Sequence, residues 1–218
     1  ELQQYAVNLL ASVFFVSNFM LMAQDGYFSQ SSENNPLLHL WSLAVEEHYY
    51  LFFPVFFVWL LRKPLQLQAW TLVALTVLLF AAGIGWVAYD RDVAFYLSPL
   101  RFYQFLAGVI CACYLPSFSQ LPKLRAWLAV SSLLLLIGCF WLYSKSTPSP
   151  GWPSLLPTVA TMILLHSAHQ SSLLNLVLSN RLMVTLGNAS YSVYLWHWPL
   201  IVFYKLSVSM QMNLSKIL

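Results

Sequence analysis

An otherwise apolar stretch of this 218-residue sequence contains two adjacent acids, two imidazoles, a hydroxyl group and two phenols. At 100° per residue, one stripe of an α-helix would carry His39, Ser42, Glu46, Tyr49 and Tyr50. A charged side chain costs about 2.5–3.5 kcal/mol at bilayer depth on insertion scales, and it persists where it faces protein or water. A helix wall with a proton carrier, a carboxylate and a phenol therefore indicates a site for proton transfer.

A second polar stripe lies near the end of the sequence. It carries Ser190, Tyr194 and His197, which are spaced i, i+4 and i+7 on one helical face. Pro199 follows and has no backbone N–H to donate. We expect this proline to kink or end the regular helix and to open backbone carbonyls close to the ring of His197.

The residues around the first stripe form a long motif. The run Pro36–Glu47 closely resembles the signature of the acyltransferase family 3 membrane proteins, which include O-antigen and peptidoglycan O-acetyltransferases. The match departs at His48, where the family usually has Gln, and at Tyr49, where it usually has Phe, and it returns at Tyr50. A second match covers Leu186–Leu200 and ends in the family's Trp-His-Trp-Pro run.

A third, weaker match covers Ser98–Gly108. The chain keeps the family's Arg101 and Gly108 but has Tyr103 for Trp and Gln104 for Glu. Arg101 would lie near the outer end of its helix, where it could hold an anionic or sugar group or pair with a glutamate of the first stripe. Its alternative role is that of a snorkelling or ion-paired residue.

The resemblance implies an enzyme that moves an acyl group, most often acetyl, from cytoplasmic acyl-CoA to a carbohydrate hydroxyl on the outer side of a bacterial inner membrane. Typical acceptors are the O-antigen of lipopolysaccharide, peptidoglycan, or another surface glycan or lipid-linked sugar. Such transfer needs a base for the attacking group and donors for the developing oxyanion.

Helical phase and the resemblance together suggest roles for individual residues. The catalytic candidates are His39, Glu46 and Tyr50. The substrate-binding candidates are Arg101, Glu47, Trp41, Ser192, Tyr194, Trp196 and His197. Tyr50 or Tyr194 would relay a proton or briefly carry the acyl group.

Composition places the chain in a membrane. Hydrophobic residues make up 60% of the sequence and charged residues 8%, whereas a soluble domain has about a quarter charged residues. An all-α, polytopic bundle of about six or seven membrane segments is the class that fits. The net charge of +3 gives no indication of a nucleic-acid partner, and the three cysteines lie in apolar runs that suggest neither a metal site nor a disulfide framework.

The apolar runs occupy about 5–23, 37–61, 67–89, 99–115, 124–143, 153–169 and 182–206. Lys and Arg concentrate in alternate connections, beginning with Arg62 and Lys63, which we place in the cytoplasm. His39 to Tyr50 would then lie in the outer half of their helix. The first run contains Asn and Ser, so two alternatives remain for it: a segment that spans the membrane and one that is re-entrant.

Residues 1–218 are expected to form part of a membrane acyltransferase domain whose first helices are missing. The resemblance implies an earlier helix with a catalytic histidine and an Arg-x-x-Arg run for acyl-CoA, and neither is found in this sequence. We therefore expect the chain alone to be inactive. The motif is also similar to that of members with an extracytoplasmic serine-hydrolase-like domain, as a fused or separate partner.

Other interpretations remain open. The glutamates could be structural, His39 could be an interfacial histidine, and Trp196 to Trp198 could belong to an aromatic belt. The competing functional class is a glycan or lipid transporter or flippase with an intramembrane proton path, although paired broken helices in matching halves are not evident. A structural or assembly subunit is the third class.

Overall fold

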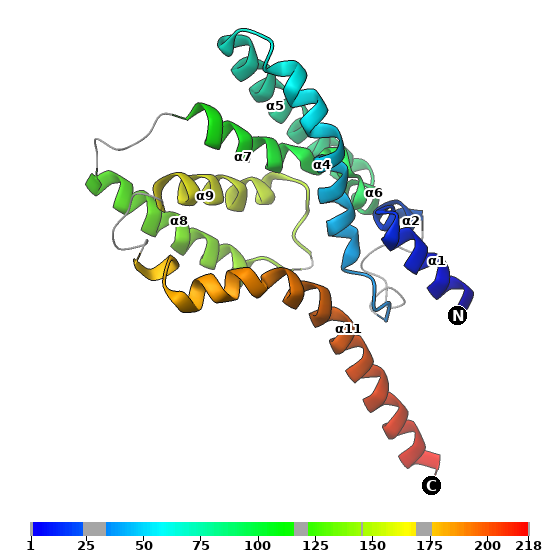
Figure 1. The fold of residues 1–218 in the computed structure, drawn as a ribbon. Coiled ribbons are helices and arrows are strands. Elements are labelled where there is room, and N and C mark those ends of the chain that lie inside the picture. Colours follow the sequence, from blue (N-terminus) through cyan, green and yellow to red (C-terminus); the bar gives the residue numbers. More distant parts are fainter. Residues whose placement is uncertain (1, 24–33, 116–121, 145, 169–175, 218) are drawn as a thin grey trace. The chain divides into compact units, whose positions relative to one another are not determined.

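Every regular element in the described part of the chain is a helix, which confirms the predicted all-α class (Figure 1). The computed structural model describes residues 2–23, 34–115, 122–144, 146–168 and 176–217. The elements are α1 (Leu2–Val13), α2 (Ser17–Ala23), α4 (Leu40–Leu60), α5 (Leu65–Tyr89), α6 (Arg91–Tyr96), the 3-10 helix η1 (Ser98–Arg101), α7 (Phe102–Tyr114), α8 (Pro122–Leu142), α9 (Trp152–Ala168) and α11 (Arg181–Ile217).

Within these described residues, three helices are long and apolar enough to cross a membrane. They are α4, α5 and the part Lys123–Leu142 of α8. This agrees with an all-helical membrane protein. The total of six or seven segments stays a prediction, because α7 and α9 have 13 and 17 residues, fewer than the roughly 20 that a bilayer requires.

The first apolar run is divided between α1 and α2. Phe15, between them, has a φ of 55°, in the left-handed region that bulky residues rarely adopt. The backbone N–H of Val16 then donates to the carbonyl of Ala11 over 2.8 Å, and Ser17 and Asn18 become buried. Neither helix alone has the length of a bilayer span.

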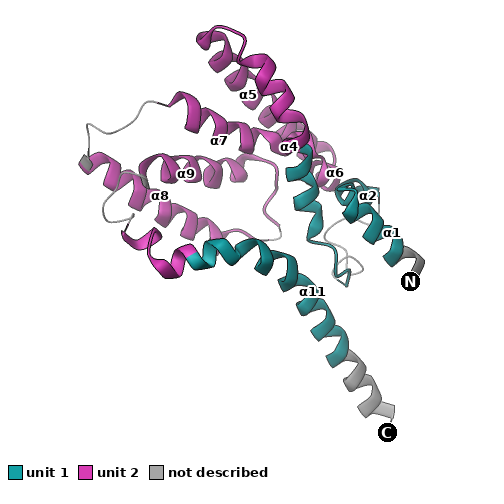
Figure 2. Cartoon of the chain, in the orientation of Figure 1, with its two compact units in different colours: residues 1–48, 185–218 teal, residues 49–184 magenta. Residues whose placement is uncertain are grey.

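The chain forms two compact units, residues 1–48 with 185–218 and residues 49–184 (Figure 2). In the second unit α7, α9 and α8 lie side by side, and α5 packs against α7 (Figure 1). Buried residues of its core are Tyr49, Leu60, Leu72 and Leu106. The ring of Tyr49 stacks on Phe53 and Phe105, at centroid distances of 4.6 and 4.8 Å, so aromatic packing joins α4 to α7.

The turn between α4 and α5 is closed by a buried amide. Gln68 Nε2 donates to the carbonyl of Lys63 over 2.8 Å, and Tyr114 donates its hydroxyl to Gln68 Oε1 over 2.8 Å. The side chain therefore satisfies backbone groups that the end of α4 leaves unpaired.

Candidate functional site

The turn before α4 places His39. Asn35 begins this turn, because its Oδ1 accepts a hydrogen bond from the N–H of Leu37 over 3.0 Å and its carbonyl accepts one from Leu38 over 3.1 Å. Such Asx turns fix the local backbone. His39 follows with only 8% of its surface exposed.

Three rings of the first unit meet at this point. His39 lies 5.2 Å from Tyr194 and 5.5 Å from His197, and Tyr194 lies 5.5 Å from His197, measured between ring centroids. His39 comes from the first polar motif and the other two residues from the second. The structure therefore brings His39 together with Tyr194 and His197, which are far from it in the sequence.

The hydroxyl of Tyr194 joins α11 to the start of α4. It donates to the main-chain carbonyl of His39 over 2.5 Å and makes a short hydrogen bond with the hydroxyl of Ser42. The Ser42 hydroxyl also lies 3.3 Å from the carbonyl of His39, and each hydroxyl has one proton, so either Ser42 or Tyr194 can donate in the bond between them. These bonds occupy the Tyr194 hydroxyl, and they suit a residue that positions His39 better than one that carries an acyl group.

His197 is held in one tautomer. Its Nδ1 lies 2.6 Å from the carbonyl oxygen of Tyr194, one turn earlier in α11. A carbonyl only accepts hydrogen bonds, so Nδ1 must carry a proton. In the neutral ring Nε2 is then unprotonated and can accept one.

Pro199 leaves a backbone carbonyl close to His39 without its usual helical donor. Helix α11 continues through this proline, which has no N–H for the carbonyl of Leu195 four residues earlier. The backbone of Leu195 faces the ring of His39. The proline thus removes the helical donor for the carbonyl of Leu195, near His39, whereas His197 bonds to the carbonyl of Tyr194, whose helical donor would be Trp198.

The imidazole of His39 is buried without a well-formed hydrogen bond. Among the described residues, neither ring nitrogen has a partner that meets hydrogen-bond geometry. His39 precedes the membrane-spanning part of α4. Burial lowers its pKa below the usual value and His197 lowers it further, while the backbone of Leu195 partly opposes this shift. A buried neutral imidazole of this kind can accept a proton.

Trp198 makes a hydrogen bond to the turn that carries His39. Its Nε1 donates to the carbonyl of Asn35 over 2.8 Å. The sequence indicated Trp198 only as part of the second motif or of an aromatic belt, and it assigned no role to Asn35. The separation of 163 residues hides this contact from any local pattern.

The remaining predicted residues of the first unit differ in how far they are buried. Glu46 and Glu47 are half-buried in α4. Trp41 is buried. Ser192 and Trp196 are exposed, the latter by 65%.

Ser190 lies one helical turn before Tyr194 in α11. The expected stripe grouped it with Tyr194 and His197, but its side chain is exposed and its hydroxyl donates to the carbonyl of Gly187 over 2.7 Å. A local bond within the helix is the usual alternative for an exposed serine.

Two predicted residues belong to the second unit. Tyr50 is 58% exposed. Arg101 donates from Nε to the carbonyl of Phe95 over 2.7 Å, and its guanidinium lies 4.5 Å from the ring of Phe95. Burial lowers the pKa of Arg101 to about 10, with partial opposition from Tyr103, so the group stays charged at neutral pH.

The third motif departs from the family pattern at Tyr103 and Gln104, and these two residues share a hydrogen-bond network. Tyr103 and Ser154 join their hydroxyls over 2.8 Å, and the amide of Gln104 donates to the Tyr103 hydroxyl over 3.2 Å. Ser154 also accepts from the N–H of Gly151 over 2.9 Å. Gln104 therefore supports the packing of α7 against α9.

A metal site was not expected from the sequence. The described residues contain no group of three His, Cys, Asp or Glu side chains that could hold an ion.

Comparison with known proteins decides the family. A family model described as an acyltransferase domain matches residues 5–215. The chain belongs to acyltransferase family 3. This acyltransferase family 3 chain is 31% identical over 213 residues to the O-acetyltransferase OatA of Staphylococcus aureus, covering 89% of the chain and 34% of that relative.

A second relative is closer in size. An uncharacterized protein of Haemophilus influenzae is 33% identical to the family 3 chain over 173 residues, which are 74% of the chain and 71% of that protein. The chain spans about a third of the length of the Staphylococcus aureus relatives that it matches. No solved structure matches the chain.

Proposed function

We propose that this chain is part of a membrane O-acyltransferase that moves an acyl group, most simply acetyl, from acyl-CoA to a hydroxyl of a cell-surface carbohydrate. Membership of acyltransferase family 3 supports acyl transfer, and the name of the relative OatA supports O-acetylation. The observation that carries the proposal is the cluster of His39, Tyr194 and His197, built from both sequence motifs.

The chemistry of the cluster suits proton removal from an alcohol. The acceptor hydroxyl must lose its proton as its oxygen bonds to the acyl carbon, and the carbon–sulfur bond to CoA then breaks with protonation of the leaving thiolate. His39 is the first candidate for the base, because its buried ring nitrogens lack well-formed hydrogen bonds within the described structure. His197, with Nε2 available, is the second.

Glu46 stays a candidate base. It lies one helical turn beyond Ser42 in α4 and is half-buried. The other assigned roles remain proposals: acyl or proton relay for Tyr50, and contacts along the acceptor path for Arg101, Glu47, Trp41, Ser192 and Trp196. The exposed positions of Tyr50 and Trp196 leave them accessible to a glycan or a lipid-linked sugar.

The cellular setting is also proposed. A bacterial inner-membrane, multi-pass location would place the acyl-CoA donor in the cytoplasm and the glycan acceptor, in lipopolysaccharide, peptidoglycan or another polymer, on the outer side. A serine-hydrolase-like domain, fused or separate, would act there as a partner.

The experiment is transfer of labelled acetyl from acetyl-CoA in membranes that contain the full-length protein. Label should appear in the surface glycan as an alkali-labile ester. Membranes with His39→Gln protein serve as the control for transfer by other enzymes. Movement of unmodified glycan across the membrane without incorporation of label would overturn the proposal and favour a flippase.

A further inference from the structure

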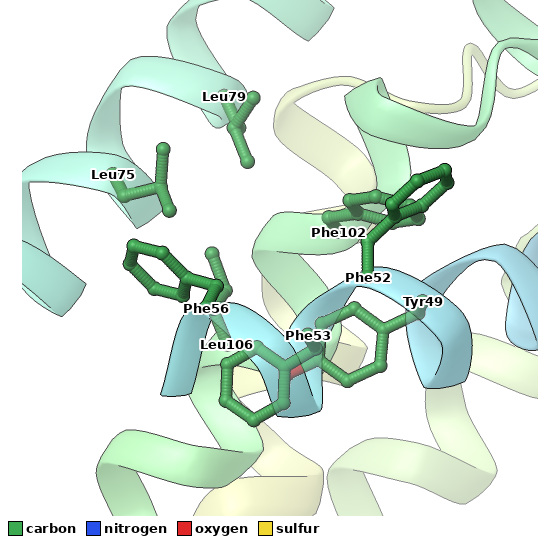
Figure 3. Close-up of a pocket in the computed structure, with 8 residues that line it drawn as sticks. All are labelled: Tyr49, Phe52, Phe53, Phe56, Leu75, Leu79, Phe102 and Leu106. Atoms are coloured by element: carbon green, nitrogen blue, oxygen red, sulfur yellow. The ribbon is translucent and has the colours of Figure 1, made fainter. Parts of the chain in front are cut away.

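The second unit contains an apolar cavity of about 140 Å³. It lies between α4, α5 and α7, and all of its lining residues belong to the second unit (Figure 3). Its lining residues are Tyr49, Phe52, Phe53, Phe56, Leu75, Leu79, Phe102 and Leu106. Figure 3 shows their rings and branched chains arranged around the space, with the two leucines of α5 opposite the aromatic side chains of α4.

The lining excludes water as a suitable occupant. A buried water needs about two to four polar partners. The walls consist of phenylalanine and leucine side chains together with the ring of Tyr49. An apolar cavity that stays empty loses dispersion contacts along its whole lining. Hydrocarbon is therefore the chemistry that fits this space.

The helices around the cavity indicate where the hydrocarbon comes from. Both α4 and α5 have the length and hydropathy of membrane-spanning helices. Phe52 at the cavity wall is 62% exposed, and its neighbours Leu51 and Val55 are 66% and 74% exposed. One wall of the cavity, at Phe52, thus belongs to an exposed face of α4. In a bilayer such a face contacts lipid chains.

We propose that the cavity binds the end of one phospholipid acyl chain. A cavity of about 150 Å³ lined by similar side chains accommodates benzene, so this one has room for about six carbon atoms. Attraction arises from packing against the rings, because lipid outside the cavity is already apolar. The inference goes beyond the proposed acyl transfer and does not depend on it.

The test uses the full-length protein in membranes that contain phosphatidylethanolamine with a photoreactive diazirine at the end of one acyl chain. After irradiation, mass spectrometry locates the label. We expect label on peptides of α4 and α7 that line the cavity, and we expect it to saturate as the fraction of probe lipid rises. Non-specific contact with surrounding lipid would instead increase in proportion to the probe.

Two variants separate the cavity from the helix surface. Leu79→Trp adds bulk inside the cavity and should abolish the saturable label. Leu78→Trp adds the same bulk at a neighbouring position that is 64% exposed, and it should leave the label unchanged. Label that rises linearly in the unaltered protein would overturn the proposal, as would label that persists in folded Leu79→Trp protein. Displacement by polyprenyl phosphate but not by unlabelled phospholipid would overturn the choice of a phospholipid chain.

Discussion

The indole nitrogen of Trp198 donates a hydrogen bond of 2.8 Å to the main-chain carbonyl of Asn35. This bond joins α11 to the turn that carries His39, and the Tyr194 hydroxyl makes a second connection at the carbonyl of His39 itself. The backbone on which the candidate base is mounted is therefore held from two points of one helix. Precise positioning of a catalytic group is what such support provides.

Replacing Trp198 with Phe should reduce acyl transfer while leaving the protein folded. The substitution keeps an aromatic ring but removes the N–H donor to Asn35, and loss of one such bond costs about 0.5–1.5 kcal/mol. We expect a lower kcat with little change in KM for the acceptor. Trp127→Phe, at a position 74% exposed in α8, is the matched control and should behave as the unaltered protein. Equal effects of the two variants would contradict the positioning role of Trp198.

Tyr194→Phe should be more damaging than Trp198→Phe. It removes the hydroxyl that bonds both the His39 carbonyl and Ser42. Loss of about 1–3 kcal/mol, as expected when buried partners are left unsatisfied, corresponds to about 5- to 150-fold in rate if it acts on the transition state. Tyr191→Phe is the control, since Tyr191 lies on the same helix and is 58% exposed. Retained activity of Tyr194→Phe would show that its hydroxyl is dispensable.

Pro199→Ala should change the pH dependence of the reaction. Alanine restores the N–H that can bond to the carbonyl of Leu195, so this carbonyl becomes less available to the ring of His39. Because the Leu195 backbone raises the pKa of His39, its withdrawal should lower that pKa and move the acidic limb of the kcat/KM profile to lower pH. A limb at the same pH would contradict this role for the proline.

Acid should destabilise the native protein through His39. Its pKa is lowered in the folded state by burial and by His197, so the unfolded state binds the proton more readily. Stability is then retained above the usual histidine pKa of about 6.5 and falls as the pH decreases below it. Thermal unfolding of the unaltered protein should therefore depend more strongly on pH between neutrality and mild acid than unfolding of His39→Gln. Parallel pH profiles for the two proteins would refute this expectation.

Local patterns were sufficient to predict much of the fold. Apolar runs at 37–61 and 67–89 correspond to α4 and α5 because each run is long, continuous and bounded by the polar turn at Arg62 and Lys63. The run at 5–23 was less informative. Its break at Phe15 depends on a left-handed backbone that no glycine signals.

The candidate site was only partly predictable. Helical phase grouped Tyr194 with His197, and the two motifs supplied His39 and His197 as separate candidates. The same phase grouped Ser190 with them, but its side chain is exposed and its hydroxyl bonds within its own helix. The bonds from Trp198 to Asn35 and from Tyr194 to Ser42 link distant segments, so only tertiary packing defines them.

The central claim is that His39 and His197 handle the proton of an acyl transfer. The most direct measurement is the rate of labelled acetyl transfer to glycan by full-length His39→Gln and His197→Gln proteins, with Ser190→Ala as the control for an exposed polar residue of the same motif. We expect each histidine variant to lose about 10²–10⁴-fold in rate, the range of general acid–base catalysis, and Ser190→Ala to keep its rate. Rates close to that of the unaltered protein in both histidine variants, at normal protein levels in the membrane, would contradict the account.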